Sequence, residues 1–329
     1  MIEQVSFVVI ARNEEFAVAK CLHSILSMPL KNCEVITIDS NSTDNTLAIM
    51  ESYIGRIANL RIIQISGYMN AAVARNAGMQ YVTKPYIFFV DGDVELFPEF
   101  ISQALGRIQT GCAAAVTGVL NELIYYDDYK NIMAPLSPRH YYHKEMAISH
   151  TGGIFLTTKH IVEMVGTWDE RMDINEDIDY TLRINRYGTF IALPNTMGTH
   201  HTLSYNARPW EHFQKRYPMY FGMLIRKNSN QPKNLLLLLK ANRGYSAGFV
   251  VYLLLVLGIM ATITLKGSFY YVFFIILLLV ITDLCWGAIR KKNIINHFLV
   301  HYLHVPLIIA GILFDTNTKR PATVKKNIY

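Results

Sequence analysis

The sequence predicts an α/β fold with a mostly parallel central sheet, followed by an α-helical membrane region. Two observations lead to this prediction. Short apolar runs alternate with helical patterns in the first part of the chain, and uncharged apolar residues gather after residue 235. With 329 residues the chain exceeds one ordinary domain, and 51% hydrophobic against 17% charged residues is apolar for a soluble protein. We therefore expect two domains, at residues 1–230 and 231–329.

The first four strands are expected where the chain is apolar and rich in β-branched or aromatic residues, at 5–10, 35–38, 60–65 and 86–90. Helical patterns lie between them, opening at Asn13 for the first and covering 70–81 for the third. Such an alternation indicates a parallel sheet with helices on both faces. Ligands of these sheets bind beyond the carboxyl ends of the strands.

Further elements are expected toward residue 205. The pattern predicts a helix over 98–110 and a strand over 113–120, and then an irregular stretch over 121–150 that is rich in Tyr and His. Order resumes at 152–156. A helix begins at Asn175 with acidic residues in its first turn, as the helix dipole favours, and Gly188 ends it. We expect Asp179 on the solvated face of that helix.

Polar clusters follow three of the predicted strands. They begin at Arg12, at Asp39 and at the pair Asp91 and Asp93, which flank Gly92. Two carboxylates at the end of a buried strand are costly unless something compensates their charge, and a hard divalent cation would do so. The alternative interpretation of Asp91-Gly92-Asp93 is a turn that ends the strand. Because the three clusters share one sheet edge, we favour a binding site there.

The C-terminal part contains three apolar segments. Residues 247–265 and 268–289 are long enough to span a membrane, whereas 298–314 is at the lower limit and is either spanning or interfacial. Basic residues at 290–292, 319–320 and 325–326 lie beside these segments and favour an anionic membrane surface over nucleic acid. The four cysteines show no metal-binding spacing and fit reduced thiols. We expect a multi-pass protein of the cell inner (cytoplasmic) membrane with its N-terminal domain in the cytoplasm.

Six stretches together resemble the glycosyltransferases of family 2, which have the GT-A nucleotide-sugar fold. They occur in the family's order at 10–15, 38–46, 74–78, 89–93, 152–156 and 175–180. The resemblance covers roughly residues 5 to 205. It implies a nucleotide-diphosphate sugar as donor, and we expect a UDP-sugar because that donor is common in the family. It also implies Mg²⁺ or Mn²⁺ bridging the diphosphate.

The resemblance also implies roles for individual residues. Other interpretations remain for two of them: Glu14 is also a common first-turn helix acid, and Arg75 is also a plausible solvated cation. The donor would be bound by Ala11, Arg12, Asn13, Glu14, Asp39, Arg75, Asp91, Gly92 and Asp93.

The metal would be bound by Asp91 and Asp93, with His200 as a third ligand. Imidazole suits Mn²⁺, but paired histidines in a loop are equally often simply exposed. On the acceptor side, the resemblance makes Asp177 the base that takes the proton of the acceptor hydroxyl, and Glu176 the neighbour that binds the acceptor.

The function implied is transfer of a single sugar, with inversion, by a metal-dependent enzyme of the hexosyltransferase type in polysaccharide biosynthesis. The acceptor expected is a lipid-linked glycan at the cytoplasmic membrane face, beside membrane lipids. One alternative is transfer onto polyprenyl phosphate itself, which needs no base. A processive polysaccharide synthase is another, but the segment 214–217 departs from the Q-x-x-R-W motif of such enzymes. A scaffold without activity is disfavoured because the acids at 39, 91, 93 and 177 are all present.

Overall fold

A computed structural model describes residues 2–126, 131–203, 216–241, 304–314 and 322–328. The chain divides into two compact units. The first is Met1–Tyr205 together with Thr318–Tyr329, and the second is Asn206–Asn317. Each unit is described separately below, and the domain division expected at residue 230 stays a prediction.

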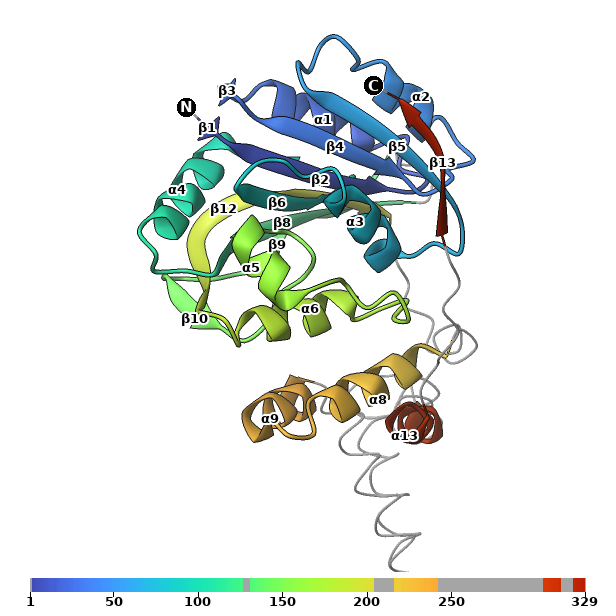
Figure 1. Ribbon diagram of the computed structural model, residues 1–329, viewed down its shortest axis with the longest axis vertical. Helices are drawn as coiled ribbons and strands as arrows, with labels where there is room; N and C mark the ends of the chain where they lie inside the picture. The colour runs from blue at the N-terminus through green and yellow to red at the C-terminus, as the bar shows by residue number, and fades with distance from the viewer. Residues whose placement is uncertain (1, 127–130, 204–215, 242–303, 315–321, 329) are drawn as a thin grey trace, which may run out of the picture. The chain divides into compact units, whose positions relative to one another are not determined.

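The first unit is built on a mixed sheet that has 11 strands among the described residues (Figure 1). Two of these strands lie off its main path: β7 (Val94–Leu96) pairs with β12, and β9 (Ile132–His140) pairs with β8. The main path runs in the order β10 (Met146–Ile148), β12 (Phe190–Leu203), β8 (Ala115–Tyr125), β11 (Phe155–Thr158), β6 (Tyr86–Asp91), β2 (Val5–Ala11), β4 (Glu34–Asp39), β5 (Leu60–Gly67) and β13 (Ala322–Ile328). A separate small sheet pairs β1 (Ile2–Glu3) with β3 (Leu30–Lys31).

The parallel part of the sheet agrees with the sequence prediction. Strands β6, β2, β4 and β5 are all parallel neighbours. The sheet as a whole is mixed rather than mostly parallel. Strand β11 is antiparallel to both β6 and β8, although β8 and β12 are parallel to each other. A strand's own residues set its burial, whereas the connection that returns it to the sheet sets its direction. Only the helical crossovers of the first four strands were visible in the sequence pattern.

Helices cover both faces of the sheet (Figure 1). One hydrophobic core contains side chains of α1 (Val18–Leu26), α2 (Thr46–Glu51) and α4 (Pro98–Gln109). The other contains side chains of α3 (Ala71–Met79), α5 (Lys159–Val165) and α6 (Glu176–Ile184). The small residues of α3 allow a close approach to the sheet, since a Cβ on Gly78 would lie 2.7 Å from side-chain atoms of both Val8 and Ile38.

The stretch 121–150, expected to be irregular, is largely ordered. Strand β8 continues to Tyr125, and β9 returns beside it as an antiparallel partner. Prolines at 135 and 138 argued against a strand, but β9 pairs with β8 alone, and an edge strand tolerates proline. The hairpin carries β9 to the carboxyl end of the sheet, where its last residue is His140.

The last described segment of the chain returns to the first unit. Strand β13 runs antiparallel to β5, from Ala322 opposite Gly67 to Ile328 opposite Ile62 (Figure 1). Residues 325 and 326, grouped with a basic tail in the sequence prediction, are part of this strand. The strand covers the edge of β5 that would otherwise present unpaired backbone groups.

The second unit contains the described helices α8 (Tyr217–Lys227), α9 (Pro232–Ala241) and α13 (His304–Leu313). Glycines let α8 and α13 pack closely, because a Cβ on Gly222 would lie 2.0 Å from the Ile308 carbonyl oxygen. Among the described residues, no helix has the length and apolar character needed to cross a membrane. The predicted spans 247–265 and 268–289 lie outside the described residues, and α13 is the described part of segment 298–314.

Candidate active site

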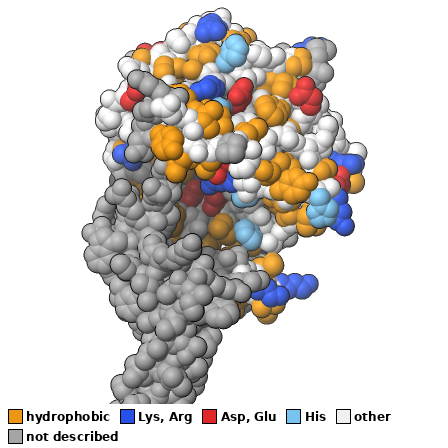
Figure 2. Space-filling model, turned by 180° about the vertical axis from the view of Figure 1, so that it is seen from behind, with side chains coloured by type: hydrophobic (Ala, Val, Ile, Leu, Met, Phe, Trp, Pro, Cys, Tyr) orange, Lys and Arg blue, Asp and Glu red, His pale blue; other side chains and the backbone are white. Residues whose placement is uncertain are grey.

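Most of the predicted donor-binding residues line one cleft at the carboxyl ends of the parallel strands. The strand register places Asp91 opposite Ile10 and Asp39 opposite Ala11. The cleft has a volume of about 300 Å³. Figure 2 shows acidic, basic and histidine side chains close together at a hollow on one face. The predicted residues that line the cleft are Ala11, Arg12, Glu14, Arg75, Asp91, Gly92, Asp93, Glu176 and Asp177.

Gly92 is required by the close approach of two strands. Its N–H donates to the Ile10 carbonyl oxygen at 2.8 Å. A Cβ on Gly92 would lie 2.7 Å from the Ala11 Cβ and 3.1 Å from that same carbonyl oxygen. The Asp91-Gly92-Asp93 segment is therefore held against β2, and its two carboxylates face the cleft.

Arg75 is not a free cation. It is 2% exposed, its Nη2 lies 2.7 Å from Asp91 Oδ1, and its Nη1 lies 3.0 Å from Glu176 Oε1. The guanidinium thus joins the strand-end acid to the helix acid, where the sequence prediction had it binding the nucleotide. Arg12, by contrast, is exposed and lines the cleft.

Two residues hold Arg75 in place: Trp168, which the prediction did not single out, and Gly153, which lies in the predicted 152–156 motif. The guanidinium Cζ lies 4.6 Å from the ring centroid of Trp168, which is stacked on Tyr180 at 3.9 Å. On another side of the guanidinium is Gly153, where a Cβ would lie only 2.0 Å from Arg75 Nη2. The Gly152-Gly153 motif therefore makes room for a buried arginine. Nothing in the spacing of the sequence indicated that contact.

His200 lies beside the second acid of the pair. The prediction placed it in a loop, but it is buried in β12, whose pairing with β7 sets His200 opposite Val94. Its Nε2 lies 2.9 Å from Asp93 Oδ2. Burial alone would lower the pKa of His200, but the hydrogen bond to Asp93 raises it overall.

The donor atoms here suit a divalent cation only in part. Asp93 Oδ1 is buried without a hydrogen-bond partner in the described part of the chain, and carboxylate oxygens with an imidazole fit Mn²⁺. Across the described ranges, however, no three His, Cys, Asp or Glu side chains converge closely enough to form a metal site by themselves. A cation held by Asp91, Asp93 and His200 would need further ligands from a diphosphate.

The first two acids of α6, Glu176 and Asp177, line the same cleft. Asn175 has a left-handed backbone with φ of 65°, which turns the chain into the helix. The Ile178 N–H donates to Asp177 Oδ1 at 2.7 Å. Burial, and then the charge of Asp177, raises the pKa of Glu176 to about 7 despite Arg75. Burial also raises the pKa of Asp177, while Arg75 opposes that rise.

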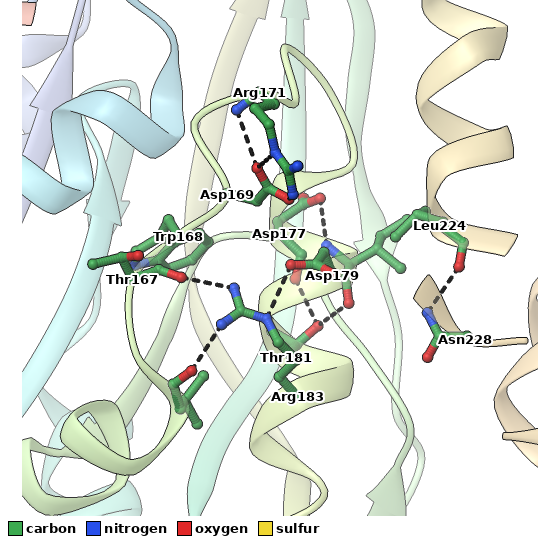
Figure 3. Close-up of polar contacts among 12 residues, drawn as sticks. Thr167, Trp168, Asp169, Arg171, Asp177, Asp179, Thr181, Arg183, Leu224 and Asn228 are labelled. Carbon is green, nitrogen blue, oxygen red and sulfur yellow. Dashed lines mark hydrogen bonds and ion pairs between the residues drawn. The ribbon is translucent and has the colours of Figure 1, made fainter. Parts of the chain in front are cut away.

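The prediction that Asp179 lies on the solvated face of α6 is wrong. It is 2% exposed and accepts a hydrogen bond of 3.0 Å from Arg183 Nε, one turn later in α6 (Figure 3). Arg183 also donates to the carbonyl oxygens of Val165 and Thr167, so the pair ties α6 to the end of α5. The alternation of acids along the helix did not reveal that this face is covered by the segment after α5.

Two of the predicted donor-binding residues, Asp39 and the exposed Asn13, lie outside the cleft lining. Asp39 is fully buried, and it accepts hydrogen bonds from Gln64 Nε2 at 2.9 Å and from the Ser42 N–H at 3.3 Å. Asn13 has φ of 56° and accepts a bond from the Thr43 N–H, which joins the two loops at this end. Neither Asp39 nor Asn13 lines the cleft. Burial, and then Asp93, raises the pKa of Glu14 to about 8.

A second, smaller cavity, here called the side pocket, adjoins the cleft. Its volume is about 90 Å³, and it shares Asp91 and Asp177 with the cleft. Strand β9 contributes Arg139 and His140, which the sequence prediction missed because it treated this segment as irregular. The other lining residues are Thr117, Leu120, Thr151, Gly152, Gly153, Ile154, Met197 and His200.

Comparison with known proteins agrees with this geometry. Residues 6–161 match the family described as "Glycosyl transferase family 2". Over that stretch, which is less than half of its length, the chain is similar to family 2 glycosyltransferase domains. Its GT-A-like fold is shared with S. aureus TarS 1-349 crystallised in complex with UDP-GlcNAc, at a TM-score of 0.58 and 16% identity, over 91% of this chain and 90% of that one.

Two curated relatives illustrate the sequence similarity. The uncharacterized glycosyltransferase EpsJ of Bacillus subtilis is 34% identical over 32% of this chain and 29% of its own length. Glycosyltransferase AglE of Haloferax volcanii is 24% identical over 64% of this chain and 70% of its own length. The match to EpsJ thus spans less than a third of that relative.

Proposed function

We propose that this protein is an inverting, metal-dependent glycosyltransferase that moves a single sugar from a nucleotide-diphosphate sugar to a hydroxyl of a lipid-linked glycan. The observation that carries the proposal is the meeting of the cleft and the side pocket at Asp91 and Asp177. A donor in the cleft and an acceptor in the side pocket would then share one reacting centre, with a carboxylate on each side.

The cleft supplies the groups that a sugar diphosphate needs. Arg12 is the exposed cation in its lining, and Asp91 and Asp93 with His200 are the residues that would hold Mg²⁺ or Mn²⁺. Such a cation, when bound, stabilises the negative charge that develops on the leaving nucleoside diphosphate. A UDP-sugar is the donor we favour, in line with the UDP-GlcNAc complex of the structural neighbour TarS.

Asp177 is the residue we assign as the base. Direct displacement at the anomeric carbon requires a group that accepts the proton of the attacking hydroxyl. The Asp177 carboxylate lines both cavities, and burial raises its pKa, which makes it a better proton acceptor than a solvated aspartate. Arg75 and Glu176 position this wall of the cleft through their ion pair.

The membrane setting remains part of the proposal. It rests on the apolar segments 247–265 and 268–289, which lie outside the described residues. A cytoplasmic catalytic unit beside the inner membrane would meet both a soluble nucleotide sugar and a lipid-linked acceptor. The curated relatives include a "Beta-monoglucosyldiacylglycerol synthase" of Synechocystis, whose name describes a lipid product.

The Asp177→Asn variant tests the assignment. We expect transfer to fall by at least about 100-fold, within the range for removal of a general base, while binding of the donor with Mn²⁺ is retained. Donor hydrolysis across a panel of nucleotide sugars identifies the substrate, and calorimetry on the variant measures donor binding. Asp39→Asn, at a buried position away from the cleft lining, is a useful comparison for effects on folding.

Other outcomes would select a different function. Full transfer by Asp177→Asn would remove the base assignment and favour polyprenyl phosphate as acceptor, since its oxygen is already anionic. Long polymeric products would favour a processive synthase. Failure to bind or hydrolyse any nucleotide sugar would contradict the proposal as a whole.

A further inference from the structure

The side pocket contains the imidazole of His140, which has no role in the proposed function so far. His140 ends β9 and lines the pocket, and no hydrogen bond within the described residues uses its ring. Burial, and then the positive charge of Arg139, lowers the pKa of His140. A neutral imidazole presents one N–H donor and one lone pair, so it can accept from a hydroxyl or donate to one.

His140 and Asp177 both lie close to Gly152. A Cβ at Gly152 would lie 3.8 Å from Asp177 Oδ2 and 3.9 Å from His140 Nε2. The two polar atoms therefore face the same open space and lie at most about 8 Å apart. Two hydrogen bonds of about 2.8 Å each, with the spacing of neighbouring hydroxyl oxygens between them, can span any separation up to about this upper bound.

We propose that the side pocket binds a vicinal diol of a sugar or polyol acceptor, with the reacting hydroxyl at Asp177 and its neighbour at His140. The inference rests on the proposed glycosyltransferase function and narrows the class of its acceptor. The cavity of about 90 Å³ has room for several water-sized groups, which suits two adjacent hydroxyls of a larger molecule.

The charges around the side pocket disfavour a phosphate as the reacting group. Two carboxylates, Asp91 and Asp177, line the pocket. The Nη1 of Arg139 is already held by Glu122 Oε1 at 3.0 Å and by His200 Nδ1 at 2.9 Å. An added anion would meet like charges at short range, whereas a neutral diol gives hydrogen bonds to both Asp177 and His140.

The test uses two alcohols that differ by one hydroxyl. Glycerol contains vicinal hydroxyls and propane-1,3-diol does not. The reaction contains the full chain, Mn²⁺ and the intact nucleotide sugar that the hydrolysis panel identifies as the donor. We expect glycerol to be glycosylated about three- to tenfold faster than propane-1,3-diol, which is the effect of one neutral hydrogen bond. His140→Ala should bring this ratio close to one and leave donor hydrolysis unchanged.

Two further variants control the result. His143 lies exposed three residues after His140, and His143→Ala should keep the ratio of the unmodified protein. Gly152→Ala would place a methyl group between Asp177 and His140 at ordinary contact distances. We expect it to fold normally, hydrolyse the donor and lose the preference for glycerol.

The outcomes separate the two proposals. Donor hydrolysis with equal use of both alcohols, or with an unchanged preference in His140→Ala, overturns the diol site and leaves the proposed function standing. So does the absence of both glycosylation and any shift of the ¹⁵N-labelled His140 resonances with glycerol. Absence of hydrolysis of every nucleotide sugar overturns the proposed function instead.

Discussion

Arg75 is the residue on which the two acidic walls of the cleft depend. A buried guanidinium is stable only when its charge is compensated, and here Asp91 and Glu176 compensate it at 2.7 and 3.0 Å. The same contacts fix both acids, one from the end of β6 and one from the first turn of α6. Trp168 adds a ring face beneath the cation. The buried arginine thus positions the Asp91 and Glu176 side chains of the cleft.

Gly153→Ala should dismantle this arrangement. The new Cβ would lie 2.0 Å from Arg75 Nη2 and 2.7 Å from its Cζ, so the guanidinium would have to move away from its partners. Breaking a buried ion pair costs about 3–5 kcal/mol. We expect a lower free energy of unfolding by about that amount and transfer reduced by at least tenfold, measured by denaturant titration and initial rates.

Gly152→Ala is the matched control for stability. Its nearest neighbours would be Asp177 Oδ2 at 3.8 Å and His140 Nε2 at 3.9 Å, which are ordinary contacts. Its free energy of unfolding should stay within about 0.5 kcal/mol of that of the unmodified protein. Equal stability of the two alanine variants would contradict the packing role of Gly153.

At the scale of elements, two strands extend the sheet beyond the sequence prediction. The β8–β9 hairpin brings Arg139 and His140 to the side pocket. Strand β13 closes the β5 edge with a segment that lies more than 250 residues later in the chain. Both are antiparallel additions at the periphery of the parallel core.

Removal of residues 322–329 should destabilise the first unit. The deletion exposes the backbone groups of β5 from Ile62 to Gly67, and each lost ladder hydrogen bond contributes about 0.5–1.5 kcal/mol. We expect a lower Tm and concentration-dependent aggregation, measured by calorimetry and light scattering. A deletion of Tyr329 alone, outside β13, should leave both unchanged. Identical behaviour of the two truncations would show that β13 contributes little to stability.

At the scale of the whole molecule, the buried acids predict a pH dependence of transfer. Asp177 must be ionised to act as a base, and its pKa is raised by burial. The initial rate should therefore fall on acidification with a midpoint above 3.8, the ordinary aspartate value. Rates measured from about pH 4 to 9 at saturating donor test this. An unchanged rate down to about pH 4 would contradict the assignment of Asp177 as base.

Unfolding of the protein at low pH would not explain this fall in the transfer rate. Because burial raises the pKa of Glu176 from 4.5 to about 7, its contribution to stability is fully present below 4.5 and is lost as pH rises through about 7. Acidification thus favours the folded state at this residue while it removes the base form of Asp177. Circular dichroism at each pH separates the two effects.

The sequence by itself determined the βαβ order, the parallel strands β2, β4, β5 and β6, and the gathering of polar residues at their carboxyl ends. Those features follow from local burial patterns and from the rule that parallel strands end at one edge. Tertiary structure decided the rest. Strand direction in β11, the edge position of β13, the partners of Arg75 and Asp179, and the place of His140 in the side pocket depend on contacts between segments far apart in the chain. Residue types and spacing do not encode such contacts, because a buried arginine and an exposed one look alike until the packed neighbours are known.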